Sequence, residues 1–175
     1  MPLENVLSEF KSSLAQCDSL IANAHQTGAG GIALLPPLDR RQITVATFLN
    51  LYIAWETFLE SSLVELMTGG VTLSGRAAVK YVSPISPEAA RRLIIGVNRC
   101  FDYGNQDLIR KIVNMYFQSG YPYEPHLSSI MSDLADLRTM RNASAHITST
   151  TQTALEGLAL RVLSRPSPNI DLYRF

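Results

Sequence analysis

The sequence predicts an all-α protein, folded as a bundle of helices. Apolar residues recur at steps of three and four along most of the chain, which is the period of a helix with one buried face. No segment shows the strict alternation of a strand, and no internal repeat is visible. Glycine and proline clusters divide the periodic segments into about six helices with short connections.

The first two helices are the best defined by their pattern. Apolar positions at helical spacing predict a helix over residues 3–24, which glycines from Gly28 onward bring to an end. Asp39 then caps a second helix over residues 39–67, which stops before Gly69. This helix is apolar around much of its circumference, so we expect it to be central in the fold.

The middle of the chain carries weaker signals. Residues 71–86 are broken by glycine and proline and contain at most a short extended piece at 80–82. Ser86 caps a helix that we expect to reach about Arg99, and a further helix is expected over residues 107–118. The prolines in residues 120–125 predict a loop.

A helix that begins at Leu127 is expected to carry the functional motif as far as His146. Ile130, Leu134, Leu137 and Met140 would form its buried stripe. A last helix is expected over residues 153–164. We therefore predict one domain over residues 1–165 and a loose C-terminal tail over residues 166–175.

Arg141 and His146 are the candidate catalytic residues. A guanidinium presents a planar fork to phosphate oxygens, and an imidazole exchanges a proton near neutral pH, so the pair suits phosphate chemistry. The two residues are five positions apart, about 140° net on a continuous helix. They would share a cleft only if the helix ends or bends between them, or if a second copy of the chain completes the cleft.

Two segments resemble a known family. Residues 134–146 contain the pattern Leu-x-x-Leu-x-x-x-Arg-Asn-x-x-Ala-His, which resembles the signature of the HEPN superfamily. Residues 52–60, with Glu56 at their centre, are similar to the acidic helix of the same superfamily, especially of its RiboL-PSP-associated branch. The resemblance implies a HEPN-like helical bundle with a four-helix core and one or two extra helices. It also implies that paired motifs form one site across a homodimer.

The same resemblance implies a metal-independent endoribonuclease that acts as a toxin or antiviral effector and needs no cofactor. It would cleave RNA to 2',3'-cyclic phosphate ends, and an antitoxin or sensor protein is a further expected partner. HEPN toxins that a partner nucleotidyltransferase silences carry a tyrosine two residues after the histidine, where this chain has Thr148. Nucleotidyl modification is therefore not expected here.

Two supporting residues leave alternatives open. Glu56 lies between aromatic neighbours and either pairs with a cation, for which Arg141 is the candidate, or faces solvent together with Glu60. Asn142 either orients the imidazole or contacts phosphate, or else it caps or kinks the helix. His25 and His126 lie in loop-like sequence and are interpreted as solvated side chains.

Composition bounds the functional classes. The net charge is zero, so RNA affinity would have to come from a local cluster. Charged residues are scarce at 17%, which favours an oligomer that covers apolar surface. Cys17 and Cys100 are expected to be reduced and buried, and no His, Cys, Asp and Glu cluster suggests a metal site.

Neither a signal peptide nor a membrane-spanning run is apparent, so a cytoplasmic protein is expected. The alternatives to a nuclease are a non-catalytic HEPN module that binds RNA, nucleotide or a partner protein, and a purely structural dimerisation unit.

Overall fold

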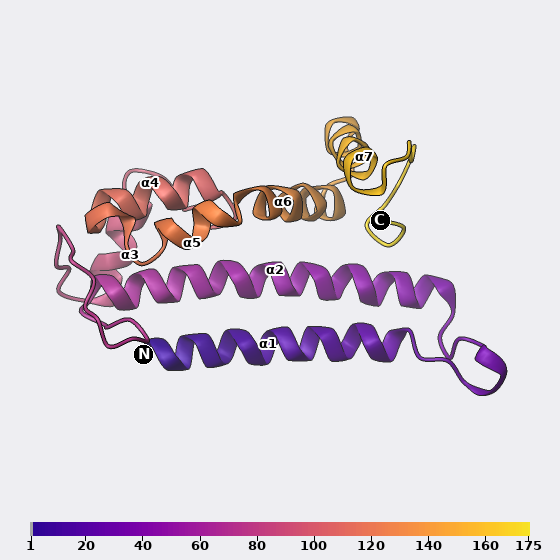
Figure 1. Cartoon of the computed structure of the whole chain (residues 1–175), viewed down its shortest axis with the longest axis horizontal. Helices are drawn as coiled ribbons and strands as arrows, with labels where there is room; N and C mark the ends of the chain where they lie inside the picture. Colours follow the sequence, from indigo (N-terminus) through magenta and orange to yellow (C-terminus); the bar gives the residue numbers. More distant parts are fainter. Residues whose placement is uncertain (1) are drawn as a thin grey trace. The chain divides into compact units, whose positions relative to one another are not determined.

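The structure is a computed structural model that describes residues 2–175 (Figure 1). In this part of the chain it contains seven α-helices and no strand, which confirms the all-α prediction. The helices are α1 (Leu3–Ala24), α2 (Pro37–Met67), α3 (Pro87–Ile95), α4 (Gln106–Tyr116), α5 (Glu124–Ser129), α6 (Met131–Ala145) and α7 (Ser149–Leu163).

The chain divides into two compact units. Unit 1 comprises Met1–Lys11 and Trp55–Leu134, and unit 2 comprises Ser12–Ala54 and Ala135–Phe175. The long helices α1, α2 and α6 contribute residues to both. Each unit has its own hydrophobic cluster and is described separately below.

The core of unit 1 lies where the last turns of α2 meet α3, α4 and α5. Its fully buried side chains include Leu63 and Met67 of α2, Val113 of α4, and Phe117 directly after α4. Gln106, at the start of α4, donates from its buried side-chain amide to the carbonyl of Leu134 at 2.9 Å. This hydrogen bond joins the first turn of α4 to the last residue of the unit.

The connection between α2 and α3 is extended and is held by backbone pairing. Lys80 forms an isolated bridge with Phe117, and the amide of Tyr81 donates to the carbonyl of Tyr116 at 2.8 Å. The Lys80 ammonium also donates to the carbonyl of Met67 at 2.7 Å, at the end of α2. The extended piece suggested at residues 80–82 therefore borders α4.

Two helices in unit 1 differ from the predicted elements. The helix that begins after Ser86 ends at Ile95, not near Arg99, because Gly96 adopts a φ of 61° and stops it. A short helix, α5, replaces the end of the loop predicted over residues 120–125, with a proline in its first turn.

The predicted helix from Leu127 to His146 is wrong as one element. Ile130, with φ and ψ of −117° and 17°, separates α5 from α6. Of the expected buried stripe, Leu134 is buried, whereas Ile130 and Leu137 are both more than one-third exposed. Because of this interruption, the apolar positions of α5 and α6 do not form one continuous buried stripe.

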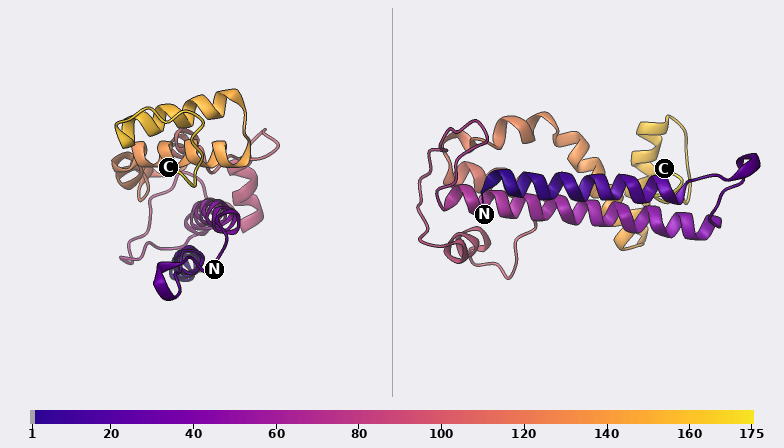
Figure 2. Two further views of the ribbon diagram at one scale, coloured as in Figure 1. Left: turned by 90° about the vertical axis from the view of Figure 1, so that its right-hand side faces the viewer. Right: turned by 90° about the horizontal axis from the view of Figure 1, so that it is seen from below.

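In unit 2, the second half of α1 lies beside the first half of α2, as Figures 1 and 2 both show. A separate small core joins α6 to α7, with Ala143 packed against Leu155, Leu158 and Ala159. Contacts between α6 and α2 and between the tail and α2 complete the unit.

The tail after α7 is packed, and the prediction that it is loose is wrong. Ile170 is buried in the α6–α7 core, and its carbonyl accepts a hydrogen bond of 2.9 Å from the side chain of Gln152. Asp171 forms an ion pair with Arg41 at 3.0 Å. Burial of apolar surface and these polar contacts therefore anchor the tail to unit 2.

The two cysteines occupy different environments. Cys17 is buried, as predicted, but Cys100 is exposed in the turn after α3, so the prediction of two buried thiols is wrong for Cys100. Both are free thiols. Among the described helices, none combines the length and apolar character needed to cross a bilayer.

Acid titration is expected to weaken unit 1 through Glu124. The guanidinium of Arg110 donates to Glu124 Oε1 from Nε at 2.9 Å, and this bond, together with those from Ser128 and Asn114, lowers the pKa of the Glu124 carboxyl. A carboxyl whose pKa is lower in the folded than in the unfolded state stabilises the fold above its unfolded pKa. That contribution disappears as the pH falls through the folded pKa.

We therefore expect Glu124→Gln to lower the free energy of unfolding at neutral pH and to match the wild type in strong acid. Urea denaturation at a series of pH values below about 5 measures the difference. A constant difference between the two proteins across that range would contradict the assignment.

Candidate active site

The motif helix ends between the two candidate catalytic residues. Its last residue is Ala145, so Arg141 lies on α6 whereas His146 is the first residue beyond it. The amide of His146 still donates to the carbonyl of Asn142 at 2.9 Å, which continues the helical turn by one bond. His146 is exposed, and Arg141 is half-buried. A helix end therefore lies between Arg141 and His146, which is one of the alternatives that the sequence left open for a shared cleft.

The backbone of His146 is held by the start of the next helix. Thr151 Oγ1 donates to the carbonyl of His146 at 2.6 Å. Thr148 and Thr151 also form a reciprocal capping box, in which each side chain accepts from the backbone amide of the other. For this reason α7 starts at Ser149 and not at residue 153, as the sequence had suggested.

Arg141 is held by an aromatic ring and an amide. Its guanidinium carbon lies 5.6 Å from the centre of the Tyr52 ring, within the range of a cation–π contact. Tyr52 is buried at 5% exposure, so it offers a fixed surface to the guanidinium. Arg141 Nη1 also donates to Asn142 Oδ1 at 3.0 Å. Both contacts restrict the orientation of the guanidinium plane.

These contacts bear on the alternatives for Asn142. Its side chain is bonded to the guanidinium of Arg141, and its backbone carbonyl accepts from His146. Asn142 therefore links the two candidate residues through two different groups. The hydrogen bond to Arg141 is not among the alternatives that the sequence suggested for Asn142.

The supporting residue Glu56 belongs to unit 1, whereas Arg141 belongs to unit 2. Glu56 is half-buried on α2, and its pairing with Arg141 stays a prediction. Its neighbour Glu60 forms an ion pair with Arg91 of α3 at 3.0 Å, so Glu60 is engaged within unit 1.

The other histidines lie elsewhere. His25 was interpreted as solvated, and it is exposed. Its Nε2 also lies 3.0 Å from Thr44 Oγ1, and its ring stacks on Tyr173 with centres 6.0 Å apart. His126 lies in the last turn of α5 and borders a pocket of unit 1. Across residues 2–175, no group of three His, Cys, Asp or Glu side chains is placed to hold a metal ion.

The arrangement of Arg141 and His146 is chemically suited to an anionic phosphodiester. A fixed guanidinium neutralises charge on phosphate oxygens, and an exposed imidazole can give or take a proton. Sequence reasoning missed Tyr52 and Thr151, the two residues that fix this pair. The place of Tyr52 in the segment that resembles the acidic helix was the available signal.

Comparison with known proteins does not assign the chain to a family. No protein-family model, no curated protein and no solved structure matches it. The resemblance to the HEPN superfamily therefore depends on the residues of the two short segments and stays a prediction.

The hydrogen bond from Thr151 Oγ1 to the carbonyl of His146 leads to a prediction. Thr151→Val keeps the shape of the side chain but removes one half of the capping box, the bond from the Thr148 amide, and also the bond to the His146 carbonyl. We expect a loss of about 1 kcal/mol in the free energy of unfolding, measured by urea denaturation. Thr153→Val is the matched control, because the Thr153 hydroxyl donates to the carbonyl of Ser149 inside α7. An equal loss of unfolding free energy in Thr151→Val and Thr153→Val would contradict a stabilising role of the capping bonds.

Proposed function

We propose that this protein is a metal-independent endoribonuclease of the HEPN type, with Arg141 and His146 as its catalytic residues. The observation that supports this proposal most is the end of α6 at Ala145. It leaves His146 exposed and joined through Asn142 to an arginine whose guanidinium is already oriented. A buried histidine, or an arginine directed into a core, would not suit an RNA substrate.

In the proposed reaction, a neutral imidazole removes the proton from a ribose 2'-hydroxyl. The 2'-oxygen then bonds to the adjacent phosphorus, and the bond from phosphorus to the 5'-oxygen breaks. A protonated imidazole gives its proton to the departing 5'-oxygen. The products are one fragment with a 2',3'-cyclic phosphate and one with a 5'-hydroxyl, so no water is consumed.

Arg141 has the electrostatic role in this proposal. Negative charge builds up on the phosphate oxygens as the 2'-oxygen attacks, and a guanidinium stabilises it best when its orientation is fixed beforehand. The ring of Tyr52 and the amide of Asn142 supply that orientation. The two contacts restrict the Arg141 side chain before RNA binds. The entropy cost of orienting the guanidinium during the reaction is therefore smaller.

The proposal also requires two copies of the chain. One copy supplies one motif histidine, whereas the reaction uses a base and an acid, so two His146 side chains would meet at the axis of a homodimer. Exposure of His146 on the surface of unit 2 is compatible with such a site. A toxin or antiviral effector of this kind would be restrained in the cytoplasm by an antitoxin or a sensor protein.

The test is RNA cleavage in the presence of a metal chelator. We expect the wild-type protein to release fragments with 2',3'-cyclic phosphate ends and His146→Gln to cleave at least about 100-fold more slowly. His25→Gln is the matched control and should cleave like the wild type, since His25 contacts Thr44 and Tyr173 and not the motif.

Two results would contradict the nuclease assignment. One is equal cleavage by His146→Gln and the wild type, which would point to a contaminating nuclease. The other is RNA binding of equal strength in both proteins with no cleavage by either, which would favour the non-catalytic binding module.

A further inference from the structure

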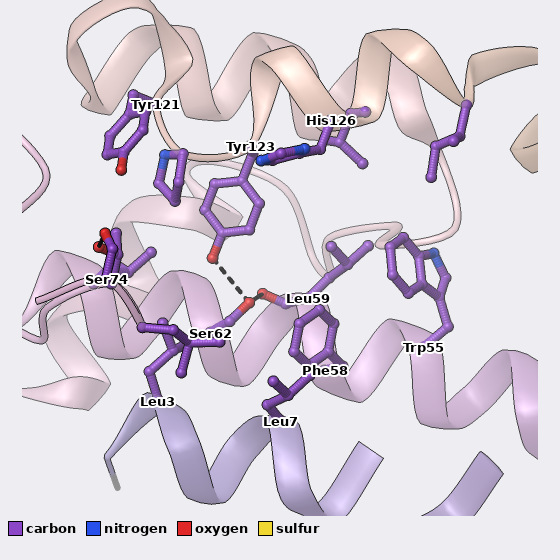
Figure 3. Close-up of a pocket in the computed structure, with 16 residues that line it drawn as sticks. Leu3, Leu7, Trp55, Phe58, Leu59, Ser62, Ser74, Tyr121, Tyr123 and His126 are labelled. Atoms are coloured by element: carbon purple, nitrogen blue, oxygen red, sulfur yellow. Dashed lines mark hydrogen bonds between the residues drawn. The ribbon is translucent and has the colours of Figure 1, made fainter. Parts of the chain in front are cut away.

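Unit 1 contains a pocket that the proposed nuclease chemistry does not use. It has a volume of about 380 Å³ and is bordered by α1, α2 and α5 and by the connection after α2. Figure 3 shows Leu3 and Leu7 on one side of it and Tyr123 and His126 on the other, with Trp55 and Phe58 projecting from α2. This volume is within the range of small-molecule sites, about 300–1,000 Å³.

The lining of the pocket disfavours charged ligands. Its walls are mostly leucine side chains and aromatic rings. Apart from the imidazole of His126, none of the described residues that border it has a side chain of a charged type. Transfer of a charged group from water to such surroundings is costly unless an opposite charge meets it. Phosphate, carboxylate and nucleotide ligands are therefore disfavoured, which separates this pocket chemically from a site for RNA.

The polar side chains that border the pocket are Ser62, Thr72, Ser74, Tyr121, Tyr123 and His126. Two of them, Tyr123 and Ser62, are hydrogen-bonded to each other. The hydroxyl of Tyr123 donates to Ser62 Oγ at 2.8 Å, and the hydroxyl of Ser62 donates to the carbonyl of Leu59 at 3.2 Å (Figure 3). Both hydrogens are thus already used, and the Tyr123 oxygen keeps the capacity to accept. Burial raises the pKa of the Tyr123 hydroxyl, so this group stays neutral. A ligand group that complements it must donate a hydrogen bond.

We propose that this pocket binds an uncharged amphiphile, a molecule with an aliphatic chain and one hydroxyl group, and that the hydroxyl donates to Tyr123. The chain of such a ligand lies against Leu7, Trp55 and Phe58, where burial of apolar surface drives binding. The single hydroxyl meets the acceptor at the Tyr123–Ser62 pair. The proposal does not depend on the nuclease activity.

Trp55 provides a direct measurement, because it borders the pocket and is the only tryptophan of the chain. Decanol is the probe, and decanoate and decyltrimethylammonium are charged probes with the same chain length. We expect decanol to change the emission of Trp55 saturably, and decanoate at neutral pH to bind at least about tenfold more weakly.

Paired tyrosine variants test the role of the hydroxyl. Tyr123→Phe should weaken decanol binding about fivefold, the effect of one lost hydrogen bond. Tyr116→Phe is the matched control, because the Tyr116 hydroxyl donates to the carbonyl of Leu93, and Tyr116 does not border the pocket. It should bind decanol as the wild type does.

Several results would overturn the proposal. If decanol leaves the emission of Trp55 unchanged, or if decanoate binds as tightly as decanol, the pocket is not a site for an uncharged amphiphile. If decyltrimethylammonium binds more tightly than decanol, the aromatic rings of the pocket instead bind a cationic ligand. If Tyr123→Phe and Tyr116→Phe weaken decanol binding equally, a hydrogen bond from the ligand to Tyr123 does not contribute to binding. The probe comparison in the wild type stands even if Tyr123→Phe fails to fold.

Discussion

Arg141→Ala is expected to reduce the rate of RNA cleavage by about 100- to 1,000-fold, the usual effect of removing one group that stabilises transition-state charge. Arg141→Lys should recover only part of the lost rate. Lysine keeps the positive charge, but it lacks the planar fork that donates to two oxygens and stacks on the Tyr52 ring. Single-turnover cleavage at saturating protein measures both variants.

The control for the arginine variants is Arg165→Ala, in the exposed segment after α7. It removes the same charge from unit 2 and should leave the cleavage rate unchanged. Equal loss in Arg141→Ala and Arg165→Ala would mean that general positive charge attracts RNA and that Arg141 has no special role. A rate for Arg141→Lys equal to that of the wild type would contradict the role assigned to the guanidinium fork.

Phe117→Ala is expected to lower the free energy of unfolding by about 3–5 kcal/mol. The ring of Phe117 is completely buried, and its centre lies 6.4 Å from the centre of the Tyr123 ring. Its removal leaves a cavity where α4, α5 and the connection after α2 meet. Urea denaturation followed by circular dichroism measures the loss.

Met115→Ala is the matched control, two residues earlier at the end of α4. Its side chain is 60% exposed, so its truncation should change the free energy of unfolding by less than about 0.5 kcal/mol. A loss of similar size in both variants would contradict the position of the unit 1 core.

The sequence was sufficient for the helices with the clearest apolar period. The bounds of α1 were predicted at Leu3 and Ala24, because this helix has apolar positions at regular spacing and glycines just beyond it. The predicted start of α2 was two residues late, since Pro37 fits the first turn of a helix and Asp39 lies within that turn. Periodic burial and stop signals are local, so one chain is enough to reveal them.

Other boundaries depended on side-chain bonds that a pattern does not reveal. The capping box of α7 uses threonine at both positions, so the usual Glu or Gln was absent as a signal and the helix was predicted four residues late. The break at Ile130 has neither proline nor glycine at the break itself. The end of α5 is therefore not marked by residue type.

The candidate site shows the same limit. Arg141, Asn142 and His146 were found from residue type and spacing, because their chemistry is apparent in the residues themselves. Tyr52 lies on another helix, far along the chain, and only the fold brings its ring to the guanidinium. A supporting contact of this kind has no signature in the spacing of the motif.

The central claim is that two His146 side chains, one from each of two copies, act on one phosphate. The most direct test unfolds wild-type protein with a ninefold excess of His146→Gln, refolds them together, and measures cleavage with RNA in excess over total protein. If the copies pair at random, about one wild-type chain in ten has a wild-type partner, so activity per wild-type chain should fall about tenfold. Activity per wild-type chain that does not change with the excess of variant would contradict the claim, because each copy would then cleave alone.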